Sequence, residues 1–186
     1  ELLSQDIGQN RWLANIRYEN SRMEELVRQF LELARMDSVR LPMTQLDFSR
    51  LVTAGILPFE STAFEKHCIL TYEIPEHIRL TGNQSMLAQL VSILLDNALE
   101  HCRPDGCVRV TLSVQRSRAV LTVSNEGQEI PPEQLSHLFE RFYRADNARS
   151  EQSGHYGLGL SIAKAVTDAH RGRLSVTSTK GLTAFT

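Results

Sequence analysis

A glycine-containing segment near the carboxyl end of the chain has the composition of a phosphate-binding site. The segment GHYGLGLSIAK, residues 154–164, places Gly157 and Gly159 directly before a predicted helix. Free N–H groups and the dipole at the start of a helix attract an anion, and glycine lets the backbone approach a phosphate closely. The alternative is that these glycines only begin the helix. The segment lacks the Lys-Ser/Thr ending of a P-loop, and it does not directly follow a strand as a dinucleotide fingerprint does.

A second segment offers metal-binding groups on one face of a predicted helix. In LLDNALEHC, residues 94–102, the spacing puts Asn97, Glu100 and His101 on one face, beside an apolar face of leucines. An asparagine carbonyl can ligate a magnesium ion that keeps most of its waters and bridges nucleotide phosphates. The alternative is a solvated or hydrogen-bonded asparagine.

A third segment places polar groups where a predicted strand ends. In VSNEGQEIP, residues 123–131, Asn125 is followed by Gly127, so the side chain can meet the edge of a base while the chain turns away. The alternative is an ordinary turn.

A fourth segment combines aromatic and basic residues inside a predicted loop. In LFERFYRAD, residues 138–146, the aromatic side chains require a docking surface, either a partner helix or a nucleotide cleft. The aromatic residues are Phe139, Phe142 and Tyr143. The basic residues Arg141 and Arg144 form a loose cluster with Arg149, which predicts either contact with phosphate or a solvated loop face.

Apolar periodicity predicts the short helices and strands that position these segments. About 30 residues, 127–156, contain only one short predicted helix, which begins at Pro131-Pro132, and loops of this length are usually functional lids or linkers. We predict a strand over 44–51 that enters a helix over 51–67 with a break at Gly55 and Pro58, and further helices over 83–103 and over 158–169, the last with Gly172 as its cap. Further strands are predicted over 69–74, 108–114, 119–123 and 173–177, plus one last strand to the end.

The amino-terminal segment carries an apolar stripe whose spacings alternate between three and four residues. Such a seam needs a partner helix, and Asn20 lies on it where a buried polar group can fix the register. The alternative is an amphipathic helix packed on its own domain. The stripe consists of Leu13, Ile16, Asn20, Met23, Val27, Phe30 and Ala34.

Composition narrows the class of protein. The chain has 186 residues and a net charge of −2, which gives no overall positive field for nucleic acid or an anionic membrane. Hydrophobic residues make up 41%, as in a globular domain. Three cysteines favour a reducing, cytoplasmic compartment, and no apolar run is long enough to span a bilayer. The start at Glu1 without methionine suggests a piece of a longer protein.

The four segments, in this order and spacing, resemble the catalytic and ATP-binding domain of bacterial sensor histidine kinases. LLDNALEH is similar to the asparagine box, NEGQEI and GHYGLGLS to the two glycine boxes, and LFERFYRAD to the phenylalanine box. The resemblance implies an α+β fold, a two-layer α/β sandwich of the gyrase, Hsp90 and histidine kinase type, with helices on one face of a mixed sheet. FLELARMDS resembles the end of the second helix of the dimerisation and histidine-phosphotransfer domain.

The resemblance implies a role for each matching position. Asn97 would ligate Mg²⁺, Asn125 would meet the adenine amino group, and backbone groups of the second glycine box would contact the phosphates of ATP or ADP. Phosphoryl transfer to a histidine nitrogen depends mainly on positioning and charge neutralisation. The full set of nucleotide contacts that we expect is Asn97, His101, Asn125, Gly127, Tyr143, Arg144, Gly157, Leu158, Gly159 and Leu160.

Four positions depart from the family pattern. Asn125 stands where an aspartate is usual, which changes the hydrogen-bonding pattern toward adenine. Glu129 replaces the second glycine of that box, Ile93 replaces the earlier asparagine, and Glu100 stands where a basic residue is usual. His101 and Arg103 are candidate substitutes for that basic residue.

The resemblance divides the chain and sets its expected activity. Residues 1–40 would be part of the dimerisation domain, which pairs in a homodimer, and 41–186 the ATP-binding domain with a lid at about 127–156. No histidine precedes His67, so we expect nucleotide binding but no autophosphorylation, and labelled ATP should leave no phosphohistidine. The expected partner is a response regulator, with membrane attachment only through segments outside this chain. Alternatives are a degenerate scaffolding module, a gyrase-like ATPase and an anti-sigma-type kinase.

Overall fold

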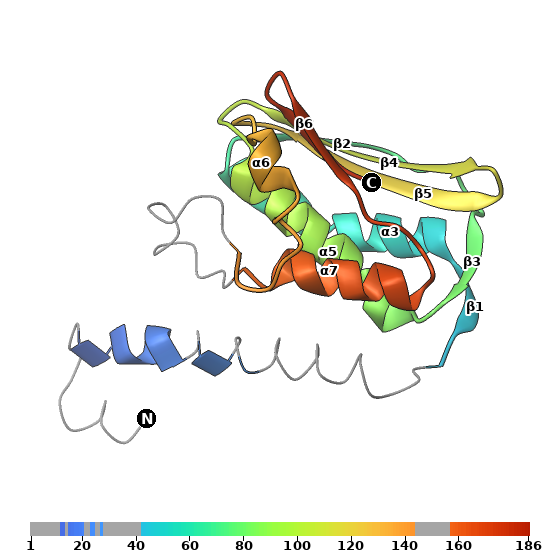
Figure 1. The fold of residues 1–186 in the computed structure, drawn as a ribbon, viewed down its shortest axis with the longest axis horizontal. Helices are drawn as coiled ribbons and strands as arrows, with labels where there is room; N and C mark the ends of the chain where they lie inside the picture. Colours follow the sequence, from blue (N-terminus) through green and yellow to red (C-terminus); the bar gives the residue numbers. More distant parts are fainter. Residues whose placement is uncertain (1–11, 14, 21–22, 25–26, 28–41, 144–156) are drawn as a thin grey trace.

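The computed structural model describes residues 12–13, 15–20, 23–24, 27, 42–143 and 157–186 (Figure 1). Helices and strands are interspersed along the chain. They are β1 (Thr44–Asp47), α3 (Phe48–Ile56), α4 (Phe59–Glu65), β2 (Ile69–Glu73), β3 (Arg79–Gly82), α5 (Gln84–His101), β4 (Cys107–Gln115), β5 (Arg118–Glu126), α6 (Pro132–Leu135), α7 (Gly159–Ala169), β6 (Val176–Thr179) and β7 (Leu182–Phe185).

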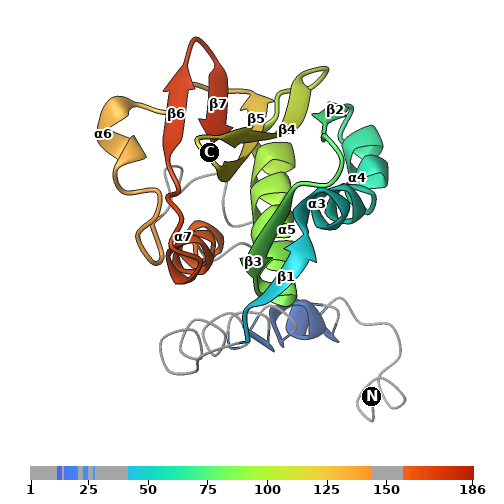
Figure 2. The ribbon, with the colours of Figure 1, turned by 90° about the vertical axis from the view of Figure 1, so that its right-hand side faces the viewer.

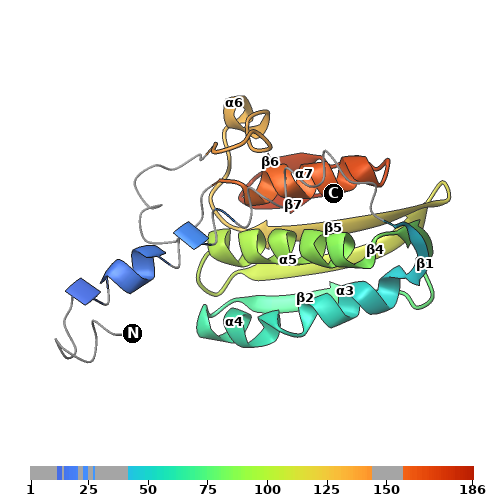
Figure 3. The same ribbon diagram turned by 90° about the horizontal axis from the view of Figure 1, so that it is seen from below.

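Five strands form the main sheet, in the order β2-β4-β5-β7-β6. β2 pairs with β4 in parallel and the other pairs are antiparallel, so the sheet is mixed, as expected. Helices α3, α5 and α7 lie side by side across one face of it (Figures 1 and 3). The predicted α/β sandwich is therefore confirmed. The sequence did not indicate that β1 and β3 form a separate antiparallel pair (Figure 2).

The β4–β5 hairpin shows why the predicted alternation fits a sheet covered on one face. Val108, Val110 and Leu112 are almost completely buried under the helices, whereas Arg109 between them is exposed. The turn consists of Arg116 and Ser117 alone, and both have positive φ angles, of 48° and 63°. Two left-handed central residues match the twist of the flanking strands.

Helix α5 is the centre of the core. It lies between α3 and α7 in Figure 3, so both of its flanks and its sheet-facing side are covered. Its apolar residues recur at helical spacing and are all buried: Met86, Leu87, Leu90, Val91, Leu94, Leu95, Ala98 and Leu99. Asn83 caps the helix, since its side-chain oxygen accepts a hydrogen bond from the N–H of Met86.

The helical segment predicted over 51–67 is broken into two helices, α3 and α4, as Gly55 and Pro58 indicated, but the first helix begins earlier than expected. The side chain of Asp47 accepts a hydrogen bond from the N–H of Arg50 at 3.1 Å, and this cap starts α3 at Phe48. The break falls at Leu57 and Pro58, and so at the proline that predicted it.

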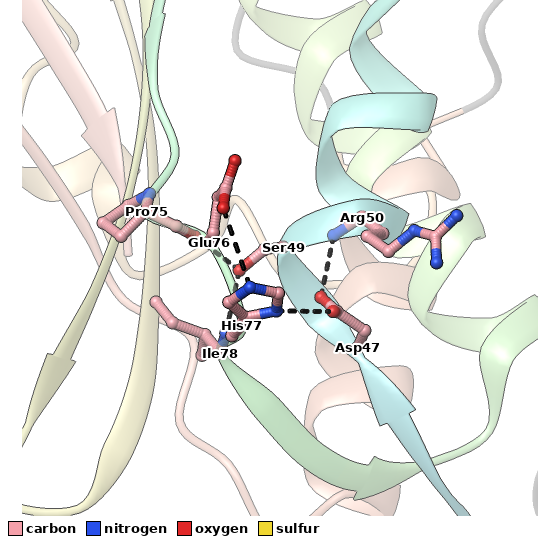
Figure 4. A network of polar contacts seen from close by, with 7 residues as sticks. All are labelled: Asp47, Ser49, Arg50, Pro75, Glu76, His77 and Ile78. Carbon is pink, nitrogen blue, oxygen red and sulfur yellow. Dashed lines mark hydrogen bonds and ion pairs between the residues drawn. The ribbon is translucent and has the colours of Figure 1, made fainter.

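Polar contacts fasten α3 to the chain between β2 and β3 (Figure 4). Buried Ser49 donates through Oγ to the carbonyl of Pro75 at 2.5 Å and accepts from the N–H of Ile78 at 3.0 Å. Exposed His77 lies 3.8 Å from Asp47, between Nδ1 and Oδ2. These residue types could suggest a catalytic triad, but Ser49 Oγ bonds to backbone groups rather than to the imidazole, so the network is structural.

Helix α7 ends at Ala169, as predicted, but the left-handed residue of its cap lies one position earlier than expected. Arg171, not Gly172, has the left-handed conformation, with φ of 56°. Its N–H donates to Asp168 O and that of Gly172 to Thr167 O, both at 2.9 Å, which is a Schellman motif. Glycine is still required at 172, because a Cβ there would lie 2.9 Å from Thr167 Cγ2.

The described residues of the amino-terminal segment are helical. Ile16, Met23 and Val27 of the predicted stripe are between 53% and 63% exposed in the single chain. Asn20 donates to Glu24 Oε1 at 3.4 Å. Phe30 and Ala34 lie outside the described residues. Among the described residues, no helix is both long and apolar enough to cross a membrane.

Candidate functional site

Two antiparallel helices bring the asparagine and glycine segments together. The end of α7 meets the start of α5, where the N–H of Asn83 donates to His170 Nε2 at 2.9 Å. At the other end of α7, a Cβ on Gly159 would lie 3.4 Å from Ile93 Cγ2. Asn97 follows Ile93 by one helical turn on the same face. The start of α7 therefore lies beside the part of α5 that carries Asn97.

The first turn of α7 has the features of an anion site. The N–H groups of Gly159, Leu160 and Ser161 have no acceptor within the helix, since its ladder begins with Ile162 N–H bonding to Leu158 O at 2.9 Å. The turn carries no acidic residue, and no side chain of the N-cap residue closes it. Gly157 has φ of 69°, which glycine adopts without strain. The helix dipole adds positive potential at this point.

Asn97 has the environment of an available oxygen ligand. Its side chain is partly buried on α5, and its amide makes no hydrogen bond with any residue that the structure describes. Of the two alternatives, a hydrogen-bonded asparagine has no support from the described residues, whereas a solvated one stays an alternative to the metal ligand. Its carbonyl oxygen therefore suits a magnesium ion that bridges phosphates.

Asn125 lies where β5 approaches the end of α5. Its side chain is 2% exposed, and Nδ2 donates to the carbonyl of His101 at 3.2 Å. This bond fixes the orientation of the amide, so Oδ1 points away as an acceptor with no donor among the described residues. An adenine amino group is a donor and matches that oxygen. The substitution from the usual aspartate thus preserves the acceptor.

Gly127 makes this approach possible. A Cβ at this position would lie 2.2 Å from His101 O, a backbone atom that cannot move aside. On its other side, the N–H of Gly127 donates to Gly181 O at 2.8 Å, which continues the pairing with β7. The strand end, the end of α5 and the β6–β7 turn are therefore packed backbone to backbone, which only a residue without a Cβ allows at this position.

Three cysteines meet beyond the end of α5. Burial raises the pKa of Cys102 to about 12, with further contributions from a hydrogen bond with Cys68 and from nearby Cys107 and Glu126. A thiol with a raised pKa is a poor metal ligand and nucleophile. Among the residues that the structure describes, no three His, Cys, Asp or Glu side chains are grouped to hold a metal.

Part of the aromatic segment packs against the domain's own core. Phe139 contacts Phe185 edge-to-face, with ring centroids 6.4 Å apart, and is partly buried there. The ring centroid of Tyr143 lies 5.5 Å from that of His137. The N–H of Phe142 donates to Gly157 O at 3.0 Å, which joins this segment to the start of α7.

The other predicted contacts divide into three groups. Leu158 and Leu160 pack in or against the core, so only their backbone groups remain for a ligand. His101 is exposed at the end of α5 and contributes its carbonyl to the Asn125 bond. Arg144 and Arg149 lie outside the described residues.

Sequence reasoning missed the bond between Asn83 and His170, because no local pattern pairs residues 87 positions apart.

Comparisons with known proteins identify the family of the chain. Residues 82–186 match the model of the family described as histidine kinase-, DNA gyrase B- and HSP90-like ATPases. The chain is 36% identical over 176 residues to the sensor protein DltS of Streptococcus agalactiae, covering 94% of this chain and 44% of that protein. It is 37% identical over 174 residues to a probable sensor histidine kinase, TcrY, of Mycobacterium tuberculosis, covering 93% and 36%. The chain thus spans less than half the length of these relatives.

A solved structure supports the fold. Histidine kinase ThkA, in complex with the response regulator protein TrrA, superposes with a TM-score of 0.75 at 21% identity, over 96% of this chain and 50% of that one. The resemblance expected from the four sequence segments is confirmed. The chain belongs to the family of histidine kinase-, DNA gyrase B- and HSP90-like ATPases, and within it to the ATP-binding domains of bacterial sensor histidine kinases.

Proposed function

We propose that this chain is the catalytic module of a sensor histidine kinase, which transfers the γ-phosphoryl group of ATP to a histidine on a dimerisation helix. From there the group passes to an aspartate of a response regulator. The convergence of three groups on one side of α5 supports the proposal most strongly: Asn97, the open first turn of α7, and the Asn125–Gly127 strand end.

Each group has a distinct part in this proposal. Asn125 Oδ1 accepts from the adenine amino group, and Gly127 lets the base approach the end of α5. The N–H groups of Gly159, Leu160 and Ser161 hold phosphate oxygens. Asn97 holds a magnesium ion, which would neutralise phosphate charge and orient the γ-phosphoryl group. His101, Tyr143 and Arg144 are proposed to border the same nucleotide.

The parts of the parent protein outside this chain complete the proposal. Residues 1–40 are proposed to belong to the dimerisation domain of a homodimer, which the exposed stripe at Ile16, Met23 and Val27 supports. Residues 41–186 are the nucleotide-binding domain. The solved complex of ThkA with a response regulator supports such a regulator as the partner. The parent is proposed to attach to the membrane with this module on the cytoplasmic side.

Calorimetric titration with ADP and with a non-hydrolysable ATP analogue tests the proposal. We expect binding that needs Mg²⁺ and that Asn97→Ala weakens by about tenfold or more, because a metal ligand is lost. Ser92→Ala is the matched control, since Ser92 is exposed on the same helix. Absence of binding by the wild-type chain, or equal loss in both variants, would contradict the assigned site.

A further inference from the structure

The imidazole of His170 joins the end of α7 to the start of α5. Its Nδ1 lies 2.7 Å from Val166 O, and its Nε2 accepts from the N–H of Asn83 at 2.9 Å. A carbonyl oxygen only accepts, so the proton is on Nδ1 and the acceptor is Nε2. One neutral tautomer thus makes two bonds, one within α7 and one between the helices.

The imidazole ring of His170 packs against the backbone of Gly82, the last residue of β3. A Cβ on Gly82 would lie 2.9 Å from His170 Cδ2 and 3.0 Å from Nε2, so only glycine leaves room for the ring. Because the ring is also tied to Val166, it has little freedom to slide along α5. The bond to Asn83 therefore fixes α7 along its axis, as well as holding it against the core.

Asn83 is an equally rigid partner, because its polar atoms all have partners. Oδ1 accepts from Met86 N at 3.1 Å and from Ser85 Oγ at 2.7 Å. Nδ2 donates to Pro42 O at 3.1 Å, and the carbonyl accepts from Leu87 N at 3.1 Å. The side chain is 8% exposed. The N–H that reaches His170 thus has a fixed direction and belongs to the capped start of α5.

The same two helices carry the nucleotide site at their other ends. The 11 residues of α7 form a helix about 16 Å long. Because this helix moves as one body, a shift of its His170 end along the helix axis also shifts Gly159 at the other end. Gly159 lies beside Ile93, one turn from Asn97. The spacing between the anion-binding turn and the metal ligand therefore depends on the axial register of α7 on α5.

We propose that His170 is a positioning residue for nucleotide binding. Its Nε2–Asn83 bond sets the register of α7 against α5, and so the place of the phosphate-binding turn relative to Asn97. The inference rests on the proposed function for its effect on nucleotide. The register itself is a property of the two helices and can be measured without ligand.

Two substitutions separate the two nitrogens of the ring. His170→Gln can restore an acceptor at the Nε2 position toward Asn83, whereas His170→Asn can restore a donor at the Nδ1 position toward Val166. We expect His170→Asn to weaken Mg²⁺-ADP binding by about three- to tenfold, the worth of one hydrogen bond, and His170→Gln to stay within about twofold of wild type. Calorimetry on the full 186-residue chain measures both.

Amide hydrogen exchange without nucleotide provides the second readout. The N–H of Ile162, in the first turn of α7, should exchange faster in His170→Asn and at the wild-type rate in His170→Gln. Thr167→Val is the matched control, since it removes the bond from Thr167 Oγ1 to Ala163 O at 2.8 Å within α7 without touching α5. All variants are compared well below their unfolding temperatures.

The outcomes separate this inference from the proposed function. Rescue by glutamine and not by asparagine, in both readouts, supports the positioning role. Rescue by asparagine alone would show that His170 only stabilises the end of its own helix, and equal exchange in all variants would also overturn the inference. If the wild-type chain binds no nucleotide, the proposed function fails, and the exchange pattern alone decides the role of His170.

Discussion

Asn125→Asp would restore the residue that is usual in the family, yet we expect it to destabilise this chain. The Nδ2 of Asn125 donates to His101 O at 3.2 Å in a site where the side chain is 2% exposed. A carboxylate cannot donate there, and it would lie at the negative end of the α5 dipole. Losing the bond and burying an unpaired acceptor costs about 2–4 kcal/mol. For a chain of this size the unfolding temperature should fall by about 5–15 °C.

The pH dependence identifies the cause. Burial beside a carbonyl raises the pKa of the introduced carboxyl above its unfolded value, so the stability deficit is complete at high pH and shrinks as pH falls through the folded value. Once protonated, the carboxyl can donate to His101 O. Thermal unfolding at pH 8 and pH 5 measures this, with Ser124→Asp on the outer face of the same strand as control. An Asn125→Asp chain as stable as wild type at pH 8 would refute the assigned orientation of the amide.

Four further substitutions test local features of the fold. Arg171→Gly should raise stability by about 0.5–1 kcal/mol, because Arg171 has φ of 56°, and a drop in the unfolding temperature would contradict the Schellman motif. Gly127→Ala should cost about 2–4 kcal/mol in chemical denaturation, since its Cβ would lie 2.2 Å from His101 O, whereas Gly159→Ala should cost under about 1 kcal/mol. Burial raises the pKa of Cys102 from 9.0 to about 12, so the unfolded chain loses this proton first and the free energy of unfolding should fall as pH rises above 9. The fall should be smaller in Cys102→Ser, and the same pH dependence in both chains would show that the pKa of the Cys102 thiol is not raised.

Much of the fold followed from local sequence patterns. The alternation of Val108, Val110 and Leu112 predicted a half-buried strand, and the leucines of residues 84–101 predicted the central helix, because burial on one face imposes these periods directly. Helix boundaries were less predictable. The cap of Asp47 starts α3 at Phe48, three residues before the predicted start, since residues on either side of such a cap tolerate both states.

The site was predictable as a set of segments and not as a geometry. The order of the asparagine and glycine segments indicated a nucleotide site, and the antiparallel contact of Gly159 with Ile93 brings them together. The contacts that hold them there, between His170 and Asn83 and between Asn125 and His101 O, join distant residues through backbone groups. Backbone groups are the same at every position, so the residue type at a position does not predict such a contact. Phe139 likewise packs against the core, where its apolar ring is partly buried.

The central claim is that α5, α7 and the end of β5 meet at one nucleotide, and nuclear magnetic resonance tests it most directly. We would titrate the labelled chain with Mg²⁺-ADP and follow the side-chain amides of Asn97 and Asn125 together with the backbone amides of Gly127 and Gly159. All four should shift together with a single dissociation constant, and the Asn97 signal should respond only when Mg²⁺ is present. Shifts confined to the opposite end of α5, near Asn83, or four unchanged signals, would contradict the account.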